Sequence, residues 1–302
     1  MPHKPVLLAE VLSHLKLSPG MIVVDGTVGG GGHSAEMLKQ VMPGGRLIGL
    51  DQDPAAIHRC KTRLEGVPGV VLIHKNFSDL GAVLQELNVL SVDAVLLDVG
   101  FSSDQLEDEA RGFSFERDGP LDMRMNPDEK LTARDYVNEL AEQELANLLW
   151  KYGNERYSRR IAKAICNVRI KKNIATTAEL ASIVRDAVPG ARSAARGHRP
   201  VWARNHPATK TFQALRIVVN QELKNLELGV RTGWAALKPG GRMAVISFHS
   251  LEDRIVKHEF LRWKQEGVGN IITRKPVCAG DDECRDNPRS RSAKLRVMEK
   301  HL

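Results

Sequence analysis

The sequence predicts an α/β fold: a doubly wound parallel sheet interrupted by a helical insertion. Short apolar runs alternate with helical patterns over about the first third of the chain. The middle third carries only helical patterns, and the alternation then resumes. Strands that alternate with helices pair in parallel through right-handed crossovers. The 302 residues are 42% hydrophobic, which suffices for a sizeable core and excludes a disordered chain or a coiled coil.

Four apolar runs in the first third predict buried strands. They are nearly continuous in hydrophobic residues, as strands covered by helices on both faces are. The predicted strands cover Met21–Asp25, Arg46–Asp51, Val70–Ile73 and Ala94–Asp98. Helical patterns follow the first three of them, over residues 34–41, from Pro54 onward, and over residues 79–87.

The insertion is predicted to begin with an acidic, glycine-rich loop over residues 99–130. From Asp98 to about Asn205 no run predicts a strand. Helical patterns cover Ala133–Val137, Gln143–Trp150, Ser158–Ile170 and Ala178–Ala187. Thr176 and Glu179 fit a capping box before the last of these helices.

After a loop rich in glycine, proline and arginine, the α/β pattern resumes. The sequence predicts a long helix, a turn, a strand, a second helix and a last edge strand, which cover Thr209–Leu237, Lys238–Gly241, Arg242–Ser247, Leu251–Gln265 and Ser292–Glu299. We therefore expect one domain over residues 1–105 and 206–302, with an inserted domain over residues 106–205.

Charge is distributed unevenly around a formal net charge of +7. Residues 156–204 hold 12 Lys/Arg against 2 Asp/Glu, whereas residues 98–145 hold 14 acids against 5 bases. Charge runs usually form solvated faces, but a basic stretch of this density also fits a phosphate-binding surface. The candidate RNA-binding residues are Arg156, Arg159, Arg160, Lys163, Lys171, Lys172, Arg289 and Arg291.

The first four of these candidates share one face of a predicted helix, because they recur at spacings of three and four. Ile161, Ala164, Ile165 and Val168 are expected on another face, toward a core.

Location and redox state follow from what the sequence lacks. No apolar run approaches the roughly 18 residues of a membrane span, and no signal segment opens the chain, so we expect a cytoplasmic protein without membrane contact. Cys60, Cys166, Cys278 and Cys284 are scattered, as reduced thiols are, and no Cys/His set has the spacing of a metal site.

A glycine-rich turn between the first strand and its helix predicts a nucleotide-like ligand. Four consecutive glycines follow Asp25, and Asp51 ends the second strand where an acid can meet ribose hydroxyls. NAD is an alternative, since residues 30–35 can be fitted to G-x-G-x-x-A. Three features favour S-adenosylmethionine (SAM): Asp25 before the glycines, Asp98 at the end of the fourth strand, and the lack of a second mononucleotide-binding half.

Sequence blocks along nearly the whole chain resemble the bacterial RsmH (MraW) family of 16S ribosomal RNA (cytosine-N4)-methyltransferases. The blocks are HKPVLL (3–8), DGTVGGGGH (25–33), LDVGFSSDQL (97–106), RGFSF (111–115), DGPLDMRM (118–125), HPATKTFQALR (206–216), ISFHSLEDR (246–254) and NPRSRSAKLR (287–296). The resemblance implies a class I SAM-dependent methyltransferase fold with an inserted helical domain. It implies the P-site cytidine of small-subunit RNA, position 1402 in the usual numbering, as substrate.

The resemblance implies that the cofactor is bound by Gly31, Gly32, His33, Asp51, Phe77, Asp98 and Gln105. We add Asp25 as a candidate because it precedes the glycines. Phe101 and Asp104 depart from the commonest form of the family, where a small aliphatic residue and a proline stand.

Three residues are candidates for catalysis. Asp98 is expected to accept a hydrogen of the cytosine amino group, Phe101 to stack on the target base, and His249 to accept a proton or, alternatively, to make a structural hydrogen bond. Phe77 covers the adenine or packs in the core. Asp51 binds ribose hydroxyls, while Asp53 before Pro54 suits a helix cap better.

Two alternative functions are methylation at another position of an RNA base and RNA binding without catalysis. Methylation at C5 of a pyrimidine needs a nucleophilic cysteine at a strand end, and Cys60 and Cys166 fall on predicted helices. A non-catalytic RNA-binding module would need only the basic stretch. The sequence leaves the oligomeric state open, a homodimer included.

Overall fold

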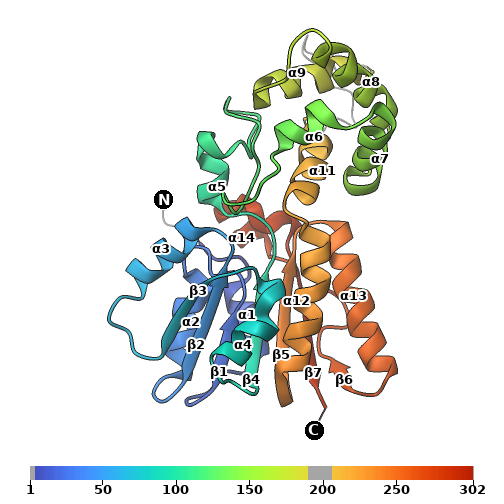
Figure 1. Ribbon diagram of the computed structural model, residues 1–302. Helices are drawn as coiled ribbons and strands as arrows, with labels where there is room; N and C mark the ends of the chain where they lie inside the picture. Colours follow the sequence, from blue (N-terminus) through green and yellow to red (C-terminus); the bar gives the residue numbers. More distant parts are fainter. Residues whose placement is uncertain (1–3, 190–205, 302) are drawn as a thin grey trace. The chain divides into compact units, whose positions relative to one another are not determined.

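The computed structural model describes residues 4–189 and 206–301 (Figure 1). The chain divides into two compact units. Met1–Gly100 with Leu223–Leu302 form the first, here called the sheet unit, and Phe101–Glu222 form the second, the helical unit. The basic residues from Arg192 to Arg204 lie outside the described residues. No helix in the described ranges is long and apolar enough to cross a membrane.

A seven-stranded sheet forms the centre of the sheet unit. Its strands are β1 (Ile22–Asp25), β2 (Arg46–Asp51), β3 (Val70–His74), β4 (Val92–Asp98), β5 (Leu237–Ser247), β6 (Gly269–Ile271) and β7 (Lys294–Lys300). They lie in the order β3-β2-β1-β4-β5-β7-β6. The first five of this order run parallel, so the predicted parallel sheet is confirmed, and β7 pairs antiparallel with both β5 and β6.

Two predictions for the end of the sheet are wrong. β7 is not an edge strand, because β6, only three residues long, pairs with its outer side. The predicted turn at Lys238–Gly241 belongs to β5. The pairing of β4 with β5 shifts its register at this point, since Val92 pairs with Leu237 but Ala94 pairs with Arg242.

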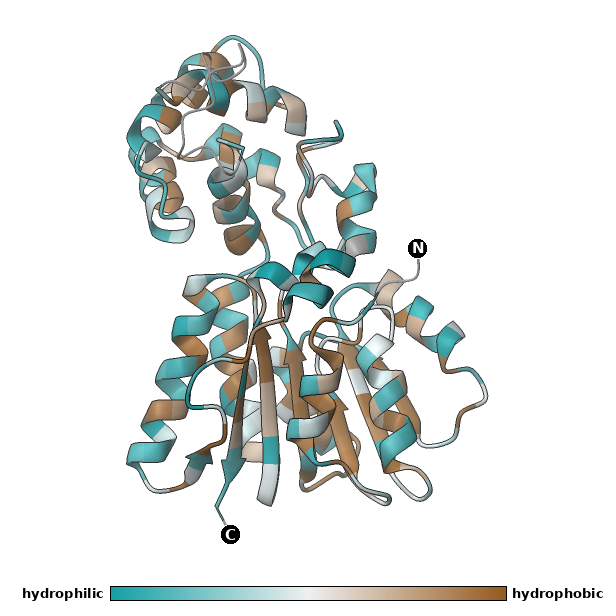
Figure 2. Ribbon diagram, turned by 180° about the vertical axis from the view of Figure 1, so that it is seen from behind, coloured by the Kyte–Doolittle hydropathy of each residue, from teal (hydrophilic) through white to brown (hydrophobic). Residues whose placement is uncertain are grey.

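Helices cover both faces of the sheet. They are α1 (Leu8–Leu15), α2 (Gly32–Val41), α3 (Pro54–Arg63), α4 (Leu80–Glu86), α12 (Glu222–Ala236) and α13 (Ser250–Gln265). The short helix α14 (Asp281–Asp286) has no buried residue and lies against the 3-10 helix η3 (Pro288–Ser292). Alternate residues of each strand enter opposite cores: Val24 and Leu97 pack with α4, α12 and α13, whereas Val23 and Leu96 pack with α1, α2 and α3. Figure 2 accordingly shows hydrophobic strands between helices of mixed hydropathy.

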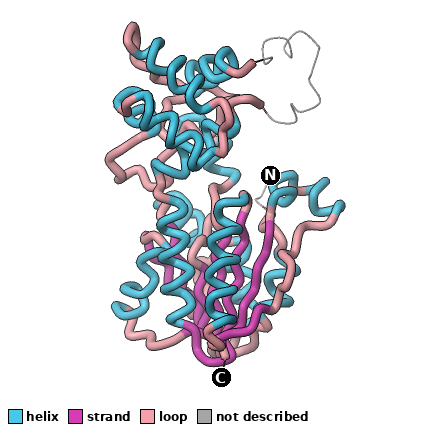
Figure 3. Tube along the Cα trace, turned by 90° about the vertical axis from the view of Figure 1, so that its right-hand side faces the viewer, coloured by secondary structure: helices cyan, strands magenta, loops and turns pink. Residues whose placement is uncertain are grey.

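The helical unit packs around one core of its own. Its elements are α5 (Ser103–Glu107), a 3-10 turn (Glu109–Arg111), α6 (Ala133–Glu139), α7 (Glu142–Gly153), α8 (Ser158–Arg169), α9 (Thr177–Ala187) and α11 (Thr209–Val219). Leu149, Ile161, Ile165, Leu180 and Phe212 are buried together in it. Figure 3 shows only helices and loops in the described part of this unit. The four predicted helices and the capping box of Thr176 with Glu179 are confirmed.

The predicted helix Thr209–Leu237 is broken in two. Gln221 takes a left-handed conformation with φ of 48° between α11 and α12. The Asn220 side chain donates to Met123 O and accepts from Met125 N, so it binds a loop far away in the sequence. Because α11 packs in the helical core, the helical unit ends later in the chain than predicted. The boundaries between the units fall at Gly100/Phe101 and Glu222/Leu223, whereas the sequence predicted 105/106 and 205/206.

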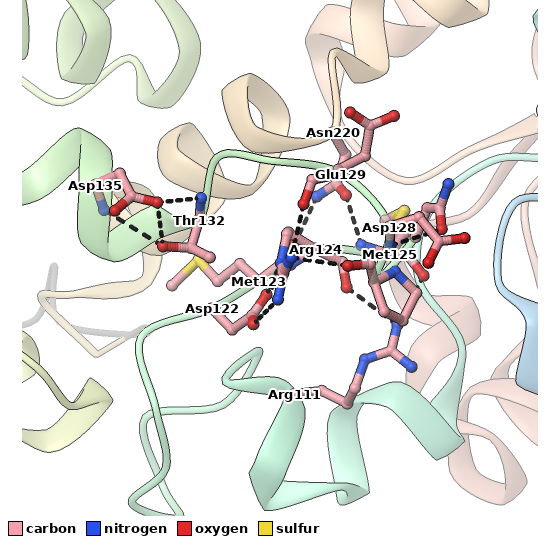
Figure 4. Close-up of polar contacts among 12 residues, drawn as sticks. Arg111, Asp122, Met123, Arg124, Met125, Asp128, Glu129, Thr132, Asp135 and Asn220 are labelled. Carbon is pink, nitrogen blue, oxygen red and sulfur yellow. Dashed lines mark hydrogen bonds and ion pairs between the residues drawn. The ribbon is translucent and has the colours of Figure 1, made fainter.

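Arginine side chains bond the backbone of the acidic loop (Figure 4). Arg124 forms two hydrogen bonds to the carboxylate of Asp122 and donates to the carbonyls of Pro127 and Glu129. Arg111 donates to the carbonyls of Arg124 and Met125. Bonds of this kind replace the backbone ladder of a helix or sheet.

Candidate active site

A buried carboxylate organises the glycine-rich turn at the carboxyl end of β1. Asp25 accepts a hydrogen bond from Thr27 N at 3.1 Å and from the Ser34 hydroxyl at 2.6 Å. Burial raises the pKa of Asp25, while these bonds and His33 lower it. Asp25 is 1% exposed, and its two bonds tie the turn to the start of α2. Its contact with a cofactor stays a prediction.

The conformation of the turn depends on its glycines, of which Gly29 and Gly30 are partly exposed and Gly31 and Gly32 are buried. Gly29 and Gly31 have φ of 50° and 74°, which only glycine adopts without strain. A Cβ at Gly30 would meet nothing within 4 Å, whereas one at Gly32 would lie 3.2 Å from Pro5. No side chain in the described ranges caps α2, which begins at Gly32, so its first N–H groups can meet an anionic or polar group.

Asp51 ends β2 next to the same turn. Its Oδ2 atom accepts from Gly29 N and its Oδ1 atom accepts from Asp53 N, both at 2.9 Å. Burial raises the pKa of Asp51 to about 6 against the effect of these two bonds. Asp53 accepts from Ala55 N and caps α3, so its predicted role as the helix cap is confirmed. Ribose binding by Asp51 stays a prediction. Each oxygen of Asp51 keeps a lone pair that fits a ribose hydroxyl.

Asp98 ends β4 and carries the unsatisfied acceptor of the site. Its N–H donates to the Thr27 hydroxyl at 2.7 Å, and its Oδ2 atom lies 3.7 Å from Nδ1 of His33. Its Oδ1 atom is buried and has no hydrogen-bond partner within the described residues. Burial raises the pKa of Asp98 to about 6, and the charges of His33 and Arg289 lower it. A buried acceptor without a donor fits a ligand that brings its own N–H or ammonium group.

Three further candidates of the sheet unit have structural partners. His33 donates from Nε2 to Val6 O at 2.9 Å. Phe77 is 9% exposed, and a Cβ at Gly229 would lie 2.2 Å from its ring, so the ring packs in the core between η1 (Phe77–Asp79) and α12. Its contact with a cofactor stays a prediction. His249 caps α13, where its Nδ1 accepts from Glu252 N, so the alternative of a structural hydrogen bond is the one observed.

Gln105 and Phe101 belong to the helical unit. Gln105 accepts from Ser102 N through its side chain and closes a capping box at the start of α5. Phe101 stacks on Phe113, with ring centroids 5.8 Å apart, and the Arg216 guanidinium lies 4.5 Å from its ring centre. These contacts give both residues a structural role within the helical unit. The predicted contact of Gln105 with the cofactor and the predicted stacking of Phe101 on the target base stay predictions.

The sequence reasoning missed four residues that shape the site. Thr27 lies inside the glycine motif and Ser34 follows it directly, and their hydroxyls are the signal that could have found them. Pro5 and Val6 lie in the matching block at the start of the chain, but nothing in the sequence places them against Gly32 and His33.

The basic face predicted on α8 exists for Arg159, Arg160 and Lys163, which are all exposed. Arg156 is exposed but precedes the helix, which begins at Ser158, so its predicted place on this face is wrong. Lys171 and Lys172 are exposed beyond the end of the helix. Lys172 pairs with Glu179 at 2.6 Å. Of the residues predicted to face the core, Ile161 and Ile165 do, and Ala164 is partly buried. Val168 does not and is 40% exposed.

Val168 is exposed because it lines a groove of about 380 Å³ between α8 and α9. Arg160, Lys163 and Asn167 line it from α8, and Ser182, Ile183 and Asp186 from α9. Arg160 and Lys163 form no ion pair with any carboxylate in the described parts of the chain. In the sheet unit, Arg289 is partly buried in the 3-10 helix η3 (Pro288–Ser292), and Arg291 donates to Cys284 O.

Comparison with known proteins identifies relatives along the whole chain. The family model of the MraW methylase family matches residues 1–301. The chain is 47% identical to the ribosomal RNA small subunit methyltransferase H of Heliobacterium mobile, over 99% of this chain and 98% of that protein. It is 49% identical to the protein of that name from Geobacter sulfurreducens, over 99% and 98%.

Solved structures that match the chain include a putative rRNA methylase from Clostridium thermocellum, with a TM-score of 0.47, 13% identity and 98% coverage of both chains. They also include a putative methyltransferase from Streptococcus mutans in complex with SAH, with a TM-score of 0.41, 12% identity and 99% coverage of both chains. The full-length match to the family model and the curated relatives at 47–49% identity decide the assignment. The chain belongs to the MraW methylase family and is a SAM-dependent methyltransferase.

Proposed function

We propose that this enzyme methylates small-subunit ribosomal RNA, and that its target is N4 of the P-site cytidine at position 1402 in the usual numbering. The observation that carries the proposal is the buried Oδ1 atom of Asp98 at the carboxyl end of β4, an acceptor for which the described residues provide no donor. Ligands of open α/β sheets bind at this end of the strands. The names of the curated relatives support small-subunit rRNA as the substrate class.

The chemistry of cytosine explains why an acceptor is needed. The N4 lone pair is delocalised into the ring, so the amino group is a poor nucleophile. An acceptor that binds an N4 hydrogen draws the nitrogen toward tetrahedral geometry and frees its lone pair. Asp98, with a pKa raised to about 6, is ionised near neutral pH and is a stronger base than an exposed aspartate.

When bound, SAM supplies a sulfonium methyl group that N4 attacks while the bonding pair stays on sulfur. The residues that fit this cofactor surround the glycine turn. Asp51 offers two acceptor oxygens for the ribose hydroxyls, the start of α2 offers N–H groups, and Asp25 holds the turn in shape. Asp98 then accepts the proton that N4 loses. Holding the reacting atoms in line supplies on the order of 7–11 kcal/mol of the barrier reduction.

The RNA is proposed to bind along the exposed face of α8. Arg159, Arg160 and Lys163 present cations that no carboxylate among the described residues neutralises, as a phosphate backbone requires. The groove beside them combines these cations with the apolar side chains of Val168 and Ile183. Such a combination suits an unpaired nucleotide, whose phosphate and base need different partners.

The properties of Cys60 argue against it as the nucleophile for the alternative chemistry at C5 of a pyrimidine. Cys60 is buried in α3, and burial together with Asp25 and Asp51 raises the pKa of its thiol to about 12. Such a thiol is protonated at neutral pH and is a weak nucleophile.

Transfer of a tritiated methyl group from SAM to isolated small ribosomal subunits tests the proposal. The digested RNA should yield labelled N4-methylcytidine from one position. Labelled 5-methylcytidine, or no label in RNA, would reject the N4 assignment. Parallel reactions with naked RNA would show whether the assembled subunit is needed.

A further inference from the structure

One peptide bond near the start of the chain links the C-terminal segment to the site of Asp98. The peptide between Val6 and Leu7 is bonded at both of its polar atoms. Leu7 N donates to Oε1 of Glu283 at 2.8 Å, and Val6 O accepts from Nε2 of His33 at 2.9 Å. The far side of the His33 ring then faces Asp98, with Nδ1 3.7 Å from Oδ2.

This arrangement fixes the tautomer of His33. A carbonyl oxygen only accepts hydrogen bonds, so Nε2 must carry the hydrogen and Nδ1 of the neutral ring must carry a lone pair. The lone pair faces a carboxylate oxygen of Asp98, so a proton that Asp98 receives has an acceptor on Nδ1. His33 is 6% exposed, so water does not readily provide an alternative partner.

We propose that Glu283 is a positioning residue of this methyltransferase: through the Val6–Leu7 peptide it holds His33 so that Nδ1 can take up the proton that Asp98 receives from the substrate. This inference rests on the proposed role of Asp98. The N4 proton moves to the Asp98 carboxylate and from there to Nδ1, which leaves a charged imidazolium and an ionised Asp98. Glu283 gains no proton and touches no substrate.

The surrounding chain holds this segment in place from several sides. Leu7 has a left-handed backbone, with φ of 54°, which a leucine keeps only where its neighbours impose it. The Asn287 side chain donates to Lys4 O at 3.1 Å, and the ring of Pro5 lies against Gly32. Residues 4–7 are thus held between the glycine turn and the segment that contains α14, and Glu283 provides the bond nearest to His33.

The other charged groups that act on Asp98 are Arg289 on η3, Asp25 on β1 and Glu252 on α13. None of them contacts the Val6–Leu7 peptide through a hydrogen bond in the described structure. A change at Glu283 therefore reaches Asp98 through His33. The charge that His33 carries once Nδ1 holds the proton lowers the pKa of Asp98, and a ring that is no longer held toward Asp98 loses this effect, so the pH at which Asp98 ionises should rise.

The test compares Glu283→Ala with Glu283→Gln, which keeps an acceptor oxygen for Leu7 N, and with Asp281→Ala, which removes an exposed carboxylate of the same helix. Nitrogen NMR of histidine-labelled protein, with the His33 signals assigned from a His33→Gln sample, reports which ring nitrogen carries the hydrogen. Single-turnover methylation is measured from pH 5 to pH 9.

We expect the Nε2–H tautomer in the wild type, in Glu283→Gln and in Asp281→Ala, and a mixture of tautomers in Glu283→Ala. In the last variant the midpoint of the pH profile should rise by about half a pH unit, so that the rate falls more at pH 6 than at pH 8. An Nδ1–H tautomer in the wild type overturns the inference without any variant, even if Glu283→Ala fails to fold. A wild-type pH profile and tautomer in Glu283→Ala, or equal effects of Ala and Gln, also overturn it.

The NMR measurement needs neither RNA nor SAM, which separates the two proposals. If the wild type transfers no methyl group to RNA but shows the expected tautomers, the proposed substrate is wrong and the positioning by Glu283 stands. If methylation proceeds and the tautomers differ from expectation, the reverse holds.

Discussion

The hydroxyl of Ser34 donates to Oδ2 of Asp25 at 2.6 Å, across the glycine turn that joins β1 to α2. Both side chains are buried, so the bond compensates part of the cost of burying a carboxylate. Ser34→Ala leaves the Asp25 carboxylate with one donor fewer. We expect a loss of about 1–3 kcal/mol in the free energy of unfolding, measured by urea titration. Ser13→Ala, which removes an exposed hydroxyl from α1, is the control and should change stability little. Equal stability of both variants would show that the turn does not depend on this bond.

The ribose assignment of Asp51 predicts a loss of cofactor affinity without a loss of fold. Asp51→Ala should weaken SAM binding by about 1.5–3 kcal/mol, the range for a charged acceptor of hydrogen bonds. Isothermal titration calorimetry measures it. Asp53→Asn, two residues away, keeps a side chain that can cap α3 and should bind SAM as the wild type does. Unchanged affinity of Asp51→Ala would reject the assignment.

The catalytic assignment of Asp98 predicts a split between chemistry and binding. Asp98→Asn keeps the shape of the side chain but removes its basicity. The single-turnover methylation rate should fall by at least about 100-fold, the lower range for a general base, while RNA affinity measured by filter binding changes less than threefold. Below pH 6 the wild-type rate should fall as well, because Asp98 then becomes protonated. Equal losses of rate and of RNA binding would remove Asp98 from the catalytic role.

The raised pKa of Asp98 also predicts a cost in stability. Its pKa is about 6 in the folded chain against 3.8 for the ordinary group, so between these values the folded state holds a proton that the unfolded state has lost. Stability from this group is therefore lost as the pH rises from about 4 to about 6. Without ligands, Asp98→Asn should gain about 1–3 kcal/mol over the wild type at pH 7.5 and less at pH 4.5, measured by urea unfolding at both pH values. A variant that is less stable than the wild type at pH 7.5 would contradict this account.

Local patterns in the sequence predict what depends on local interactions. The run Arg46–Asp51 gives β2 with the predicted bounds, and the capping box at Thr176 begins α9. The three acids at the ends of β1, β2 and β4 could be predicted to lie together, since parallel strands end at one edge.

Interactions between distant residues account for what the sequence could not predict. The break between α11 and α12 depends on bonds from Asn220 to Met123 and Met125, 97 and 95 residues away. β6 is too short to form a pattern of its own and exists because β7 offers it a partner. In the site, the contact of Val6 with His33 joins two motifs whose spacing carries no signal of the contact.

The basic face of α8 makes the most specific prediction about RNA. Replacing Arg159, Arg160 and Lys163 with glutamine removes three exposed cations and keeps side chains that suit a helix. RNA binding should weaken, and the slope of log K against log salt should flatten by a little under one unit for each phosphate contact that is lost. SAM affinity should not change, because the glycine turn lies in the sheet unit. The matched control replaces Lys61, Lys257 and Lys264, three exposed lysines of the sheet unit, and lowers the net charge by the same amount. If both triple variants lose affinity equally, only the total charge matters; if neither does, α8 has a structural role and the RNA binds elsewhere, with Arg289 and Arg291 as the next residues to replace.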